Sequence, residues 1–446
     1  MFIESELELR RITESLRLGD SFWIPVFSDP YKHYTQNRIS ALYIYSIADD
    51  LDYFVSFHNS DCLNFNTELI QEFTSSCNIF VLSKKRFNYT YSNTCYDADL
   101  FAWWHTGRML ALDETNTSAH DMWNKWWYNE SNTNDWLPAA KHLERCRAMR
   151  DVFMPIYNSY KLTTDFVNYE RHMIDNMFGI ECNGICVDPA LLQQHFNQTT
   201  RTGLVYSEYN PYTSTGRPSN KFGGINYAAL NKEDGSRGML QSRYERGMLL
   251  EFDYDAFHVR LIADLIGYVL PDESVHSYFG KQYFGKTELT QEEYDQSKQM
   301  TFHLLYGGID SEFEKIPFFG QTKQYIAKLW KEFKRNGVIY TPKFHRPIMS
   351  QTVTDANAGK VFNYLLQATE TEHNMTVINN VHEMLSGYSS KLILYTYDSL
   401  LFDYDLADGR DLIFKIKETI SAGGYPVKIK AGVNYHAMTD MTGKVS

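Results

Sequence analysis

The chain has 446 residues, 43% of them hydrophobic and 15% aromatic, which suffices for about two to four domains and excludes wholesale disorder. Its net charge of −12 gives no general attraction to nucleic acid, and no stretch approaches the ~18 uninterrupted apolar residues of a membrane span. Because the first twenty residues are charged and the cysteines are few and scattered, we expect a soluble, cytoplasmic protein.

Residues 20–105 predict strands followed by helices, in a small α/β or α+β unit. Four apolar segments, "FWIPVFSD", "RISALYIYSIA", "LDYFVSF" and "NIFVLSKKRF", lead to a helix near "DADLFAWWHTGRML". The polar segment 113–135 indicates a long surface loop, and helices follow from about 136 to 182.

From residue 204 the chain alternates strand and loop, and it becomes helical from about 290 to 336. It closes with a helix over 362–388, a strand "KLILYTYDSLLFDYD", a helix over 407–421 and a strand "YPVKIKAGVNY". This order predicts an α+β fold with helices packed on a small antiparallel sheet and a helical insertion between strands.

Two apolar strands each end in a carboxylate. The run "GMLLEFDYDAFHVRLIADLIG" reaches Asp253, and "LILYTYDSLLFDY" reaches Asp398. An ionised side chain there is costly unless it is paired or holds a metal. Brought together by a sheet, the two acids can bridge two Mg²⁺ ions about 3.5–4 Å apart, although strand-end aspartates are often only turn residues.

A third element changes the balance between these interpretations. The segment "TQEEYDQSKQMTFHLLYGG" opens with a capping box, Thr290 and Glu293. Within the predicted helix Lys298, Phe302 and Tyr306 recur every four residues, so they form one stripe of a cation and two aromatic rings. An aromatic stripe is usually core, but the lysine before it and the glycine after it favour a specific role.

Basic residues cluster in two places, "KQYIAKLWKEFKRNGVIYTPKFHRP" (323–347) and "SRGMLQSRYER" (236–246). Each cluster alone is typical of a solvated face. An acidic protein that holds nucleic acid would nevertheless keep its positive charge in such local grooves.

With these motifs the sequence resembles the family A (DNA polymerase I-like) DNA polymerases of phage type. "DYDAFHVRLIADLIG" is similar to motif A, with Arg260 in the structural arginine position, "KQMTFHLLYG" to the fingers helix and "LYTYDSLLFD" to motif C. "STGRPSN", "NYLLQ" and the closing "YPVKIKAGVNYHAM" follow in the family's pattern.

The resemblance implies a DNA-templated DNA polymerase that extends a primer 3′-hydroxyl with deoxynucleoside triphosphates by a two-metal mechanism. Asp253, Asp398 and the main-chain carbonyl of Tyr254 would hold two Mg²⁺ ions, or Mn²⁺ in their place. Lys298 would contact the incoming triphosphate and act in catalysis as a point charge or a general acid.

The resemblance also implies substrate contacts. Phe302 would contact the sugar and base of the nucleotide, and Tyr306 the nascent base pair. Arg217 would bind the primer-template, and Asn363 with Gln367 would contact the template side.

Three positions depart from the family pattern. Tyr294 stands where a second cation for the triphosphate is usual, and Ser399 replaces a glutamate after Asp398. His258 replaces the glutamate beneath the deoxyribose. Because histidine is bulky enough to crowd a 2′-hydroxyl, we expect retained but altered sugar selectivity.

The N-terminal unit stands where the family carries a 3′–5′ exonuclease domain. Its first strand lacks an Asp-x-Glu pair, Asn88 stands where an aspartate is expected, and only Asp151 survives. One carboxylate cannot hold two Mg²⁺ ions, so we expect a degenerate, non-cleaving RNase H-like domain.

The family's long helical thumb does not fit between Leu192 and Thr215, which are 215 − 192 = 23 residues apart. Two antiparallel helices of ~20 Å each need about 13 residues apiece. With a reduced thumb, the grip on duplex DNA should be weak and salt-sensitive unless a processivity or replisome partner supplies it.

The expected architecture is a polymerase palm with a helical fingers insertion and an N-terminal exonuclease-like α/β domain. In chain order its parts are 1–155, exonuclease-like; 156–203, helical connector with vestigial thumb; 204–267, first palm part; 268–350, fingers; 351–446, second palm part.

Two alternatives stay open. The acid-to-serine change at Ser399 also occurs in phage single-subunit RNA polymerases, which lack an aromatic at the Phe302 position and the upstream Thr-x-Gly-Arg. A non-catalytic replication subunit with a polymerase fold would explain the departures, but it has no reason to keep charged groups in a cleft. If the protein is viral, we expect it in the cytoplasm of the host cell.

Overall fold

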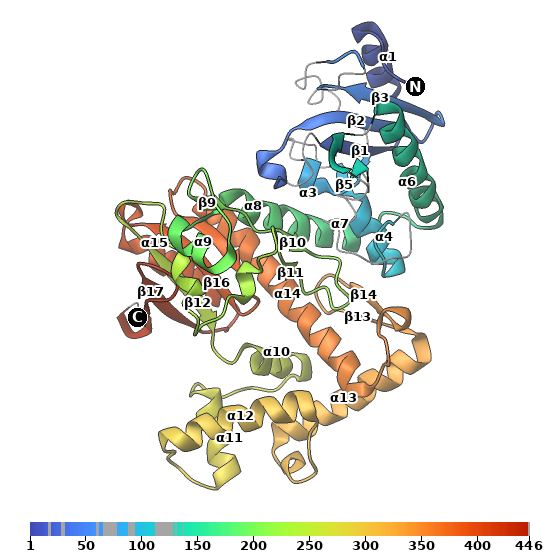
Figure 1. Cartoon of the computed structure of the whole chain (residues 1–446). Coiled ribbons are helices and arrows are strands. Elements are labelled where there is room, and N and C mark those ends of the chain that lie inside the picture. Colours follow the sequence, from blue (N-terminus) through green and yellow to red (C-terminus); the bar gives the residue numbers. More distant parts are fainter. Residues whose placement is uncertain are drawn as a thin grey trace. The chain divides into compact units, whose positions relative to one another are not determined.

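The computed structural model describes residues 1–16, 19–27, 32–58, 62–65, 78–87, 94–111, 128–129, 132–136 and 138–444. The chain forms two compact units (Figure 1). Unit 1 comprises Met1–Cys182, Tyr206–Tyr212 and Ser219–Ile225, and unit 2 comprises Asn183–Val205, Thr213–Pro218 and Asn226–Ser446. Asn88 and most of the predicted loop 113–135 lie outside the described residues.

Unit 1 is built on a five-stranded sheet in the order β3-β2-β1-β4-β5. β1 pairs antiparallel with β2, and β2 with β3, whereas β1–β4 and β4–β5 are parallel. Every residue of β1 and β2 is buried, which is typical of strands covered on both faces. The strands are β1 (Ser21–Phe27), β2 (Ile39–Ser46), β3 (Leu51–Ser56), β4 (Ile79–Val81) and β5 (Cys95–Asp97).

Helices cover this sheet through aromatic contacts. Phe153 stacks on Phe22 of β1 with 4.4 Å between ring centroids, and Phe101 meets Phe80 of β4 edge-on. The helices are α1 (Glu6–Leu16), α3 (Lys84–Phe87), α4 (Ala98–Thr106), α6 (Ala139–Ser159), α7 (Thr164–Glu170) and α8 (Asn176–Asn183). The expected mixture of strands and helices is therefore present.

Two short pairs of strands complete the described part of unit 1. β10 (Tyr209–Asn210) pairs with β11 (Ser219–Asn220). Inside the predicted polar loop, β6 (Tyr128–Asn129) pairs with β7 (Asn132–Trp136). The polar composition did not predict this hairpin, because backbone pairing needs no alternation of apolar side chains.

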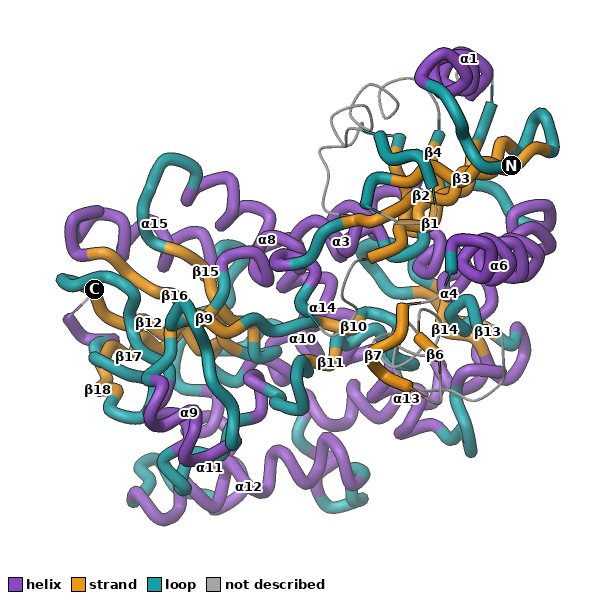
Figure 2. The backbone as a smooth tube through the Cα atoms, turned by 45° about the horizontal axis from the view of Figure 1, so that its top comes forward, coloured by secondary structure: helices purple, strands orange, loops and turns teal. Residues whose placement is uncertain are grey.

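Unit 2 contains an antiparallel sheet in the order β15-β16-β12-β17-β18, seen from a second direction in Figure 2. β12 lies at its centre, and the middle of that strand is buried. The strands are β12 (Gly247–Tyr254), β15 (Lys391–Tyr395), β16 (Ser399–Asp405), β17 (Val427–Gly432) and β18 (Met438–Asp440).

Helices of unit 2 pack on the sheet or follow β12 as the expected insertion (Figure 1). They are α9 (Pro189–Phe196), α10 (Phe257–Ile266), α11 (Val275–Phe284), α12 (Gln291–Gly307), α13 (Pro317–Asn336), α14 (Ala358–Leu385) and α15 (Arg410–Ser421). The remaining paired strands are β8 (Ile185–Cys186) with β9 (Leu204–Val205), and β13 (Val338–Tyr340) with β14 (Pro347–Met349).

The helical region expected from about 290 to 336 consists of two helices, since Gly307 and Gly308 end α12 and Pro317 begins α13. One sequence prediction needs correction. The single strand expected over 391–405 is the hairpin β15–β16. Its turn uses Tyr397 at φ 75°, and no glycine or proline marks that turn in the sequence.

The described residues contain no helix that is both long and apolar enough to cross a membrane.

Candidate active site

The sheet of unit 2 brings Asp253 and Asp398 side by side. Asp253 lies near the end of β12, opposite Ser399 in the register with β16. The backbone N–H of Tyr254 donates to the carbonyl oxygen of Asp398 at 2.9 Å. The two aspartates, 145 residues apart in the chain (398 − 253), therefore come from directly neighbouring backbone segments.

Strained backbone flanks both aspartates. Ala256, three residues after Asp253, has φ 54°, and Tyr397, immediately before Asp398, has φ 75°. A left-handed conformation costs a non-glycine residue on the order of 1–3 kcal/mol and persists only where surrounding contacts hold it. Asn374 provides one such contact, because its Nδ2 donates to the carbonyl oxygen of Tyr397 at 2.7 Å.

The pKa values of both acids are raised above those of ordinary aspartates. Desolvation and then the negative charge of Asp398 raise the pKa of Asp253 to about 6. Desolvation and then the charge of Glu370 raise the pKa of Asp398. Two adjacent carboxylates with such raised pKa values suit a hard divalent cation, which oxygen ligands prefer.

Two carboxylates are also as many as a catalytic Mg²⁺ site needs from the protein. Mg²⁺ in phosphoryl-transfer enzymes is held by one or two carboxylates, with substrate phosphates and water as the other ligands. Among the residues that the structure describes, no group of three His, Cys, Asp or Glu side chains is arranged to hold a metal by itself. The residues present thus fit a site completed by substrate.

Lysines on β17 add positive charge beside the acids. Lys430 Nζ lies 3.6 Å from Asp253 Oδ2 and 2.9 Å from Glu251 Oε2. Lys428, opposite Asp253 in the strand register, makes a 2.7 Å ion pair with Asp255. The sequence analysis did not identify either lysine, since alternation along a closing strand does not show which neighbour it pairs with.

Helix α12 carries the predicted stripe. The capping box is formed, with the Glu293 N–H donating to Thr290 Oγ1 at 3.2 Å. The rings of Phe302 and Tyr306 are nearly parallel, 9° apart, with centroids 6.2 Å from each other. Tyr306 is 43% exposed and Lys298 is exposed, so this stripe is open to a ligand.

His258 connects motif A to this stripe. Its Nδ1 shares a hydrogen bond with the Tyr306 hydroxyl. Its Nε2 lies 3.1 Å from Oε1 of Glu370, a side chain of α14 that is 1% exposed. Desolvation, and then the charge of Glu370, raise the pKa of Tyr306 to about 12.

Arg217 belongs to the same cluster. Its Nε lies 3.1 Å from Oε2 of Glu370, and its guanidinium lies over the Tyr397 ring at 3.8 Å. Five of the residues identified in the sequence are thus brought together by contacts or shared charge: Asp253, Asp398, His258, Tyr306 and Arg217.

The sequence analysis did not identify Glu370, although a signal existed. Asn363, Gln367, Glu370 and Asn374 occur at i, i+4, i+7 and i+11 of α14, so four polar residues share one face of a helix that is otherwise largely buried. Within the described residues, Asn363 Oδ1 is buried and has no hydrogen-bond partner. Asn363 and Gln367 lie on this polar face, where an added ligand could satisfy them.

The other identified residues have mainly structural surroundings. The Tyr254 side chain is buried and stacks on Phe257 with centroids 4.2 Å apart. Tyr294 packs edge-on against His276. Arg260 Nε donates to the Asp255 carbonyl at 2.9 Å, which ties α10 to the end of β12.

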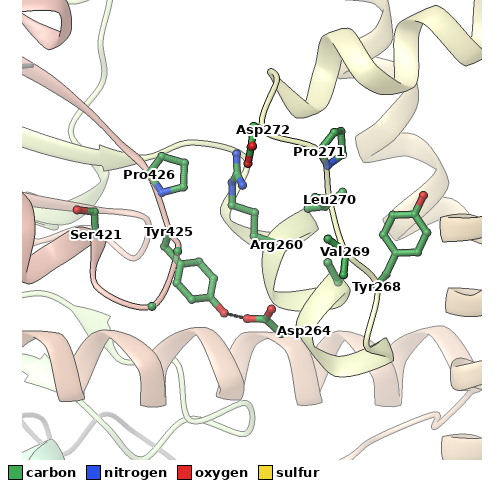
Figure 3. A pocket seen from close by; sticks show the side chains of 13 residues that line it. Arg260, Asp264, Tyr268, Val269, Leu270, Pro271, Asp272, Ser421, Tyr425 and Pro426 are labelled. Atoms are coloured by element: carbon green, nitrogen blue, oxygen red, sulfur yellow. Dashed lines mark hydrogen bonds between the residues drawn. The ribbon is translucent and has the colours of Figure 1, made fainter.

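A pocket of about 590 Å³ lies behind α10 (Figure 3). Arg260 lines it, and Figure 3 shows Tyr425 pointing toward Asp264, to which its hydroxyl donates. The pocket contains neither Asp253 nor Asp398 among its lining residues, so we separate it from the candidate site.

Among the described residues of unit 1, the positions that the sequence analysis considered form no cluster of acids. Asp151 lies on α6 with 65% of its side chain exposed and pairs with Arg150 at 2.7 Å. Three consecutive buried cations lie on α3, and each meets a carboxylate: Lys84 with Glu170, Lys85 with Glu181 and Arg86 with Glu208, at 3.0, 2.7 and 2.8 Å.

The comparison with known proteins gives a fold. Neither a protein-family model nor a curated protein matches the sequence. Among solved structures, the chain is similar to the POL domain of Pol1 from M. smegmatis, in complex with DNA primer-template and dNTP, with a TM-score of 0.73. The match covers 98% of this chain and 100% of that chain at 15% identity. The fold is therefore that of a polymerase domain.

Proposed function

We propose that the protein is a DNA-templated DNA polymerase of the family A type, which extends a primer 3′-hydroxyl with deoxynucleoside triphosphates. One observation carries the proposal: Asp253 and Asp398, from distant parts of the chain, are neighbours across β12 and the β15–β16 turn. The charge of Asp398 also reaches Tyr306, which links the acids to the stripe on α12.

The two aspartates and the Tyr254 carbonyl would hold the divalent ions, Mg²⁺ or Mn²⁺. When bound, such ions activate the attacking 3′-oxygen and neutralise charge on the transferred phosphate and on the pyrophosphate. Burial and then the charge of Asp398 raise the pKa of Asp253 to about 6, so a divalent cation would be favoured beside these two carboxylates.

The side chains on α12 would position the nucleotide. Phosphoryl transfer depends on positioning and charge neutralisation more than on covalent chemistry. Lys298, exposed at the first position of the stripe, supplies a cation for the triphosphate. Phe302 and Tyr306, with parallel rings, supply a surface for the sugar, the base and the nascent pair.

Contacts to the DNA would come from Arg217 on the primer-template side and from the polar face of α14, with Asn363 and Gln367, on the template side. The solved neighbour with the same fold is a complex with DNA primer-template and dNTP, which supports these partners here.

Unit 1 would be a degenerate exonuclease-like domain. Its strand order, with three antiparallel strands followed by two parallel ones, supports an RNase H-like fold. The exposure of Asp151, which pairs with Arg150, supports the loss of cleavage.

Primer extension with Mg²⁺ tests the proposal. Wild type should add deoxynucleotides that complement the template, and Asp253→Asn and Asp398→Asn should each lose on the order of 10³-fold in kcat/KM, equivalent to about 4 kcal/mol of transition-state stabilisation. Asp411→Asn, an exposed acid on α15, is the matched control and should retain activity.

Further arms of the same assay separate the alternatives. Ribonucleotide incorporation as efficient as deoxynucleotide incorporation would favour a primer-extending RNA polymerase. No extension by wild type, with or without replication extracts, would favour a non-catalytic subunit. Trimming of unpaired 3′ ends would contradict the loss of exonuclease activity.

A further inference from the structure

We infer that Glu370 is a positioning residue for sugar selection, which acts by holding His258 and Arg217 in place; this inference depends on the proposed function. It is a single carboxylate on α14 that faces a nitrogen-bearing side chain with each of its oxygens. Oε1 faces His258 Nε2 and Oε2 faces Arg217 Nε, both at 3.1 Å.

The burial of Glu370 increases the energetic importance of its contacts with His258 and Arg217. Glu370 is 1% exposed, and an ionised carboxylate at such a position costs several kcal/mol, roughly, unless countercharge compensates it. Within the described residues, Glu370 Oε2, Arg217 Nε and His258 Nε2 have no aligned hydrogen-bond partner. The contact with Arg217 is therefore ionic, and the charge of Glu370 rather than an exact hydrogen-bond geometry attracts both the guanidinium and the Nε2 position of His258.

The first consequence concerns the ring of His258. A carboxylate at Nε2 favours a proton on that nitrogen and leaves Nδ1 to the Tyr306 hydroxyl, so Glu370 sets the tautomer and the orientation of the ring. His258, in turn, fixes Tyr306 at the end of the stripe on α12. The resemblance to the polymerase family places these two side chains beneath the sugar and the nascent pair.

The second consequence concerns Asp398. Arg217, held by the other oxygen of Glu370, lies over the Tyr397 ring at 3.8 Å. Tyr397 precedes Asp398 and has the left-handed φ of 75°. One buried carboxylate thus connects the sugar side of the site with the turn that presents a proposed metal ligand.

This connection explains a departure in the sequence. Where the family pattern has a glutamate, this chain has His258. The carboxylate at this place comes instead from Glu370 on α14, which contacts His258 Nε2. Sugar discrimination in this protein should therefore depend on position 370 as well as on position 258.

The test compares Glu370→Gln with Glu372→Gln. Glu372 is also 1% exposed on α14, but it accepts from Thr341 Oγ1 at 2.5 Å and from the Phe344 N–H, away from His258. Glu370→Gln should lower the ratio of kcat/KM for dNTP over rNTP by ~10-fold. Glu372→Gln should leave that ratio unchanged.

A double variant tests whether Glu370 acts on sugar selection through His258. Because Glu370 acts on the sugar through His258, adding Glu370→Gln to His258→Gln should not lower the discrimination further. Additive losses would overturn the inference, and so would equal losses in Glu370→Gln and Glu372→Gln. If Glu370→Gln fails to fold, Glu370→Asp keeps the charge but withdraws it from His258, and it should give an intermediate loss.

A measurement that does not depend on catalysis tests this inference separately from the proposed function. In ¹⁵N-histidine NMR spectra, with the His258 signals assigned through His258→Gln, Glu370→Gln should shift the His258 ring nitrogens and Glu372→Gln should not. Unchanged His258 signals would overturn the inference whether or not the protein extends primers.

Discussion

At the scale of single residues, Ala256 and Tyr397 show what the site demands of the backbone. Both have positive φ angles without being glycine, and they flank the two aspartates proposed to hold metal. Such strain clusters where surrounding contacts can hold it, often at functional sites. The sequence identified Asp253 and Asp398 because an acid ending an apolar strand is conspicuous. The polar face of α14 gave a signal for Glu370, but its partners Arg217 and His258 depend on which elements that face meets, and the sequence does not show this.

His276 gives a prediction on pH and stability. It is 3% exposed beside Tyr294 and Phe302, and desolvation lowers its pKa to about 4. The unfolded chain, with a histidine pKa of about 6.5, binds the proton first as pH falls, so the free energy of unfolding decreases between pH 6.5 and 4.

Between pH 7 and 5, wild type should therefore lose ~2 kcal/mol more of its unfolding free energy than His276→Leu does. Urea unfolding at the two pH values measures the difference. His436→Leu, at an exposed histidine, is the control and should follow wild type. Parallel pH dependence in wild type and His276→Leu would show that the imidazole is not buried as described.

At the scale of elements, the long periodic helices were predictable and the turns were not. The capping box and stripe of α12 follow from local spacing. The hairpin β15–β16 did not, because a tyrosine rather than glycine adopts the left-handed turn. This turn, and not a continuous strand, therefore presents Asp398, a proposed metal ligand.

Helix α13 carries a prediction on DNA binding. Lys328, Lys331, Lys334 and Arg335 are exposed, whereas Phe318, Leu329 and Phe333 are buried. If this basic face contacts template phosphates, the double variant Lys328→Ala and Lys331→Ala should reduce the slope of log K against log salt by about 1 per lost contact.

The measurement is the fluorescence anisotropy of a primer-template with a single-stranded 5′ extension, titrated at several salt concentrations. Lys415→Ala with Lys417→Ala, on α15 of the same unit, is the control pair. An unchanged slope in the α13 variant, or an equal change in the control, would show that the basic face of α13 does not contact the DNA.

At the scale of the whole molecule, the chain has the fold of a polymerase domain. In the fully described segment between Leu192 and Thr215, α9 ends at Phe196 and only short strands follow. The spacing in the sequence predicts a reduced thumb, and the reduced thumb stays a prediction. The limits of the two units could not be predicted, because residues 206–212 and 219–225 join unit 1 while the segment between them joins unit 2.

If the thumb is reduced as proposed, the isolated protein should have low processivity. In the presence of a DNA trap, each binding event should yield only short extension products, and products should shorten further as salt rises, because few phosphate contacts hold the duplex. Long products that are insensitive to salt under the same trap would contradict a reduced thumb.

The central claim is that Asp253 and Asp398 jointly bind divalent ions beside the nucleotide. Binding of Mn²⁺, followed by electron paramagnetic resonance in the presence of primer-template and a non-hydrolysable dNTP, tests it most directly. The account predicts that Asp253→Asn and Asp398→Asn each weaken Mn²⁺ binding at least ~10-fold, about 1.4 kcal/mol, and that Asp411→Asn leaves it unchanged. Wild-type Mn²⁺ affinity in both aspartate variants would contradict it.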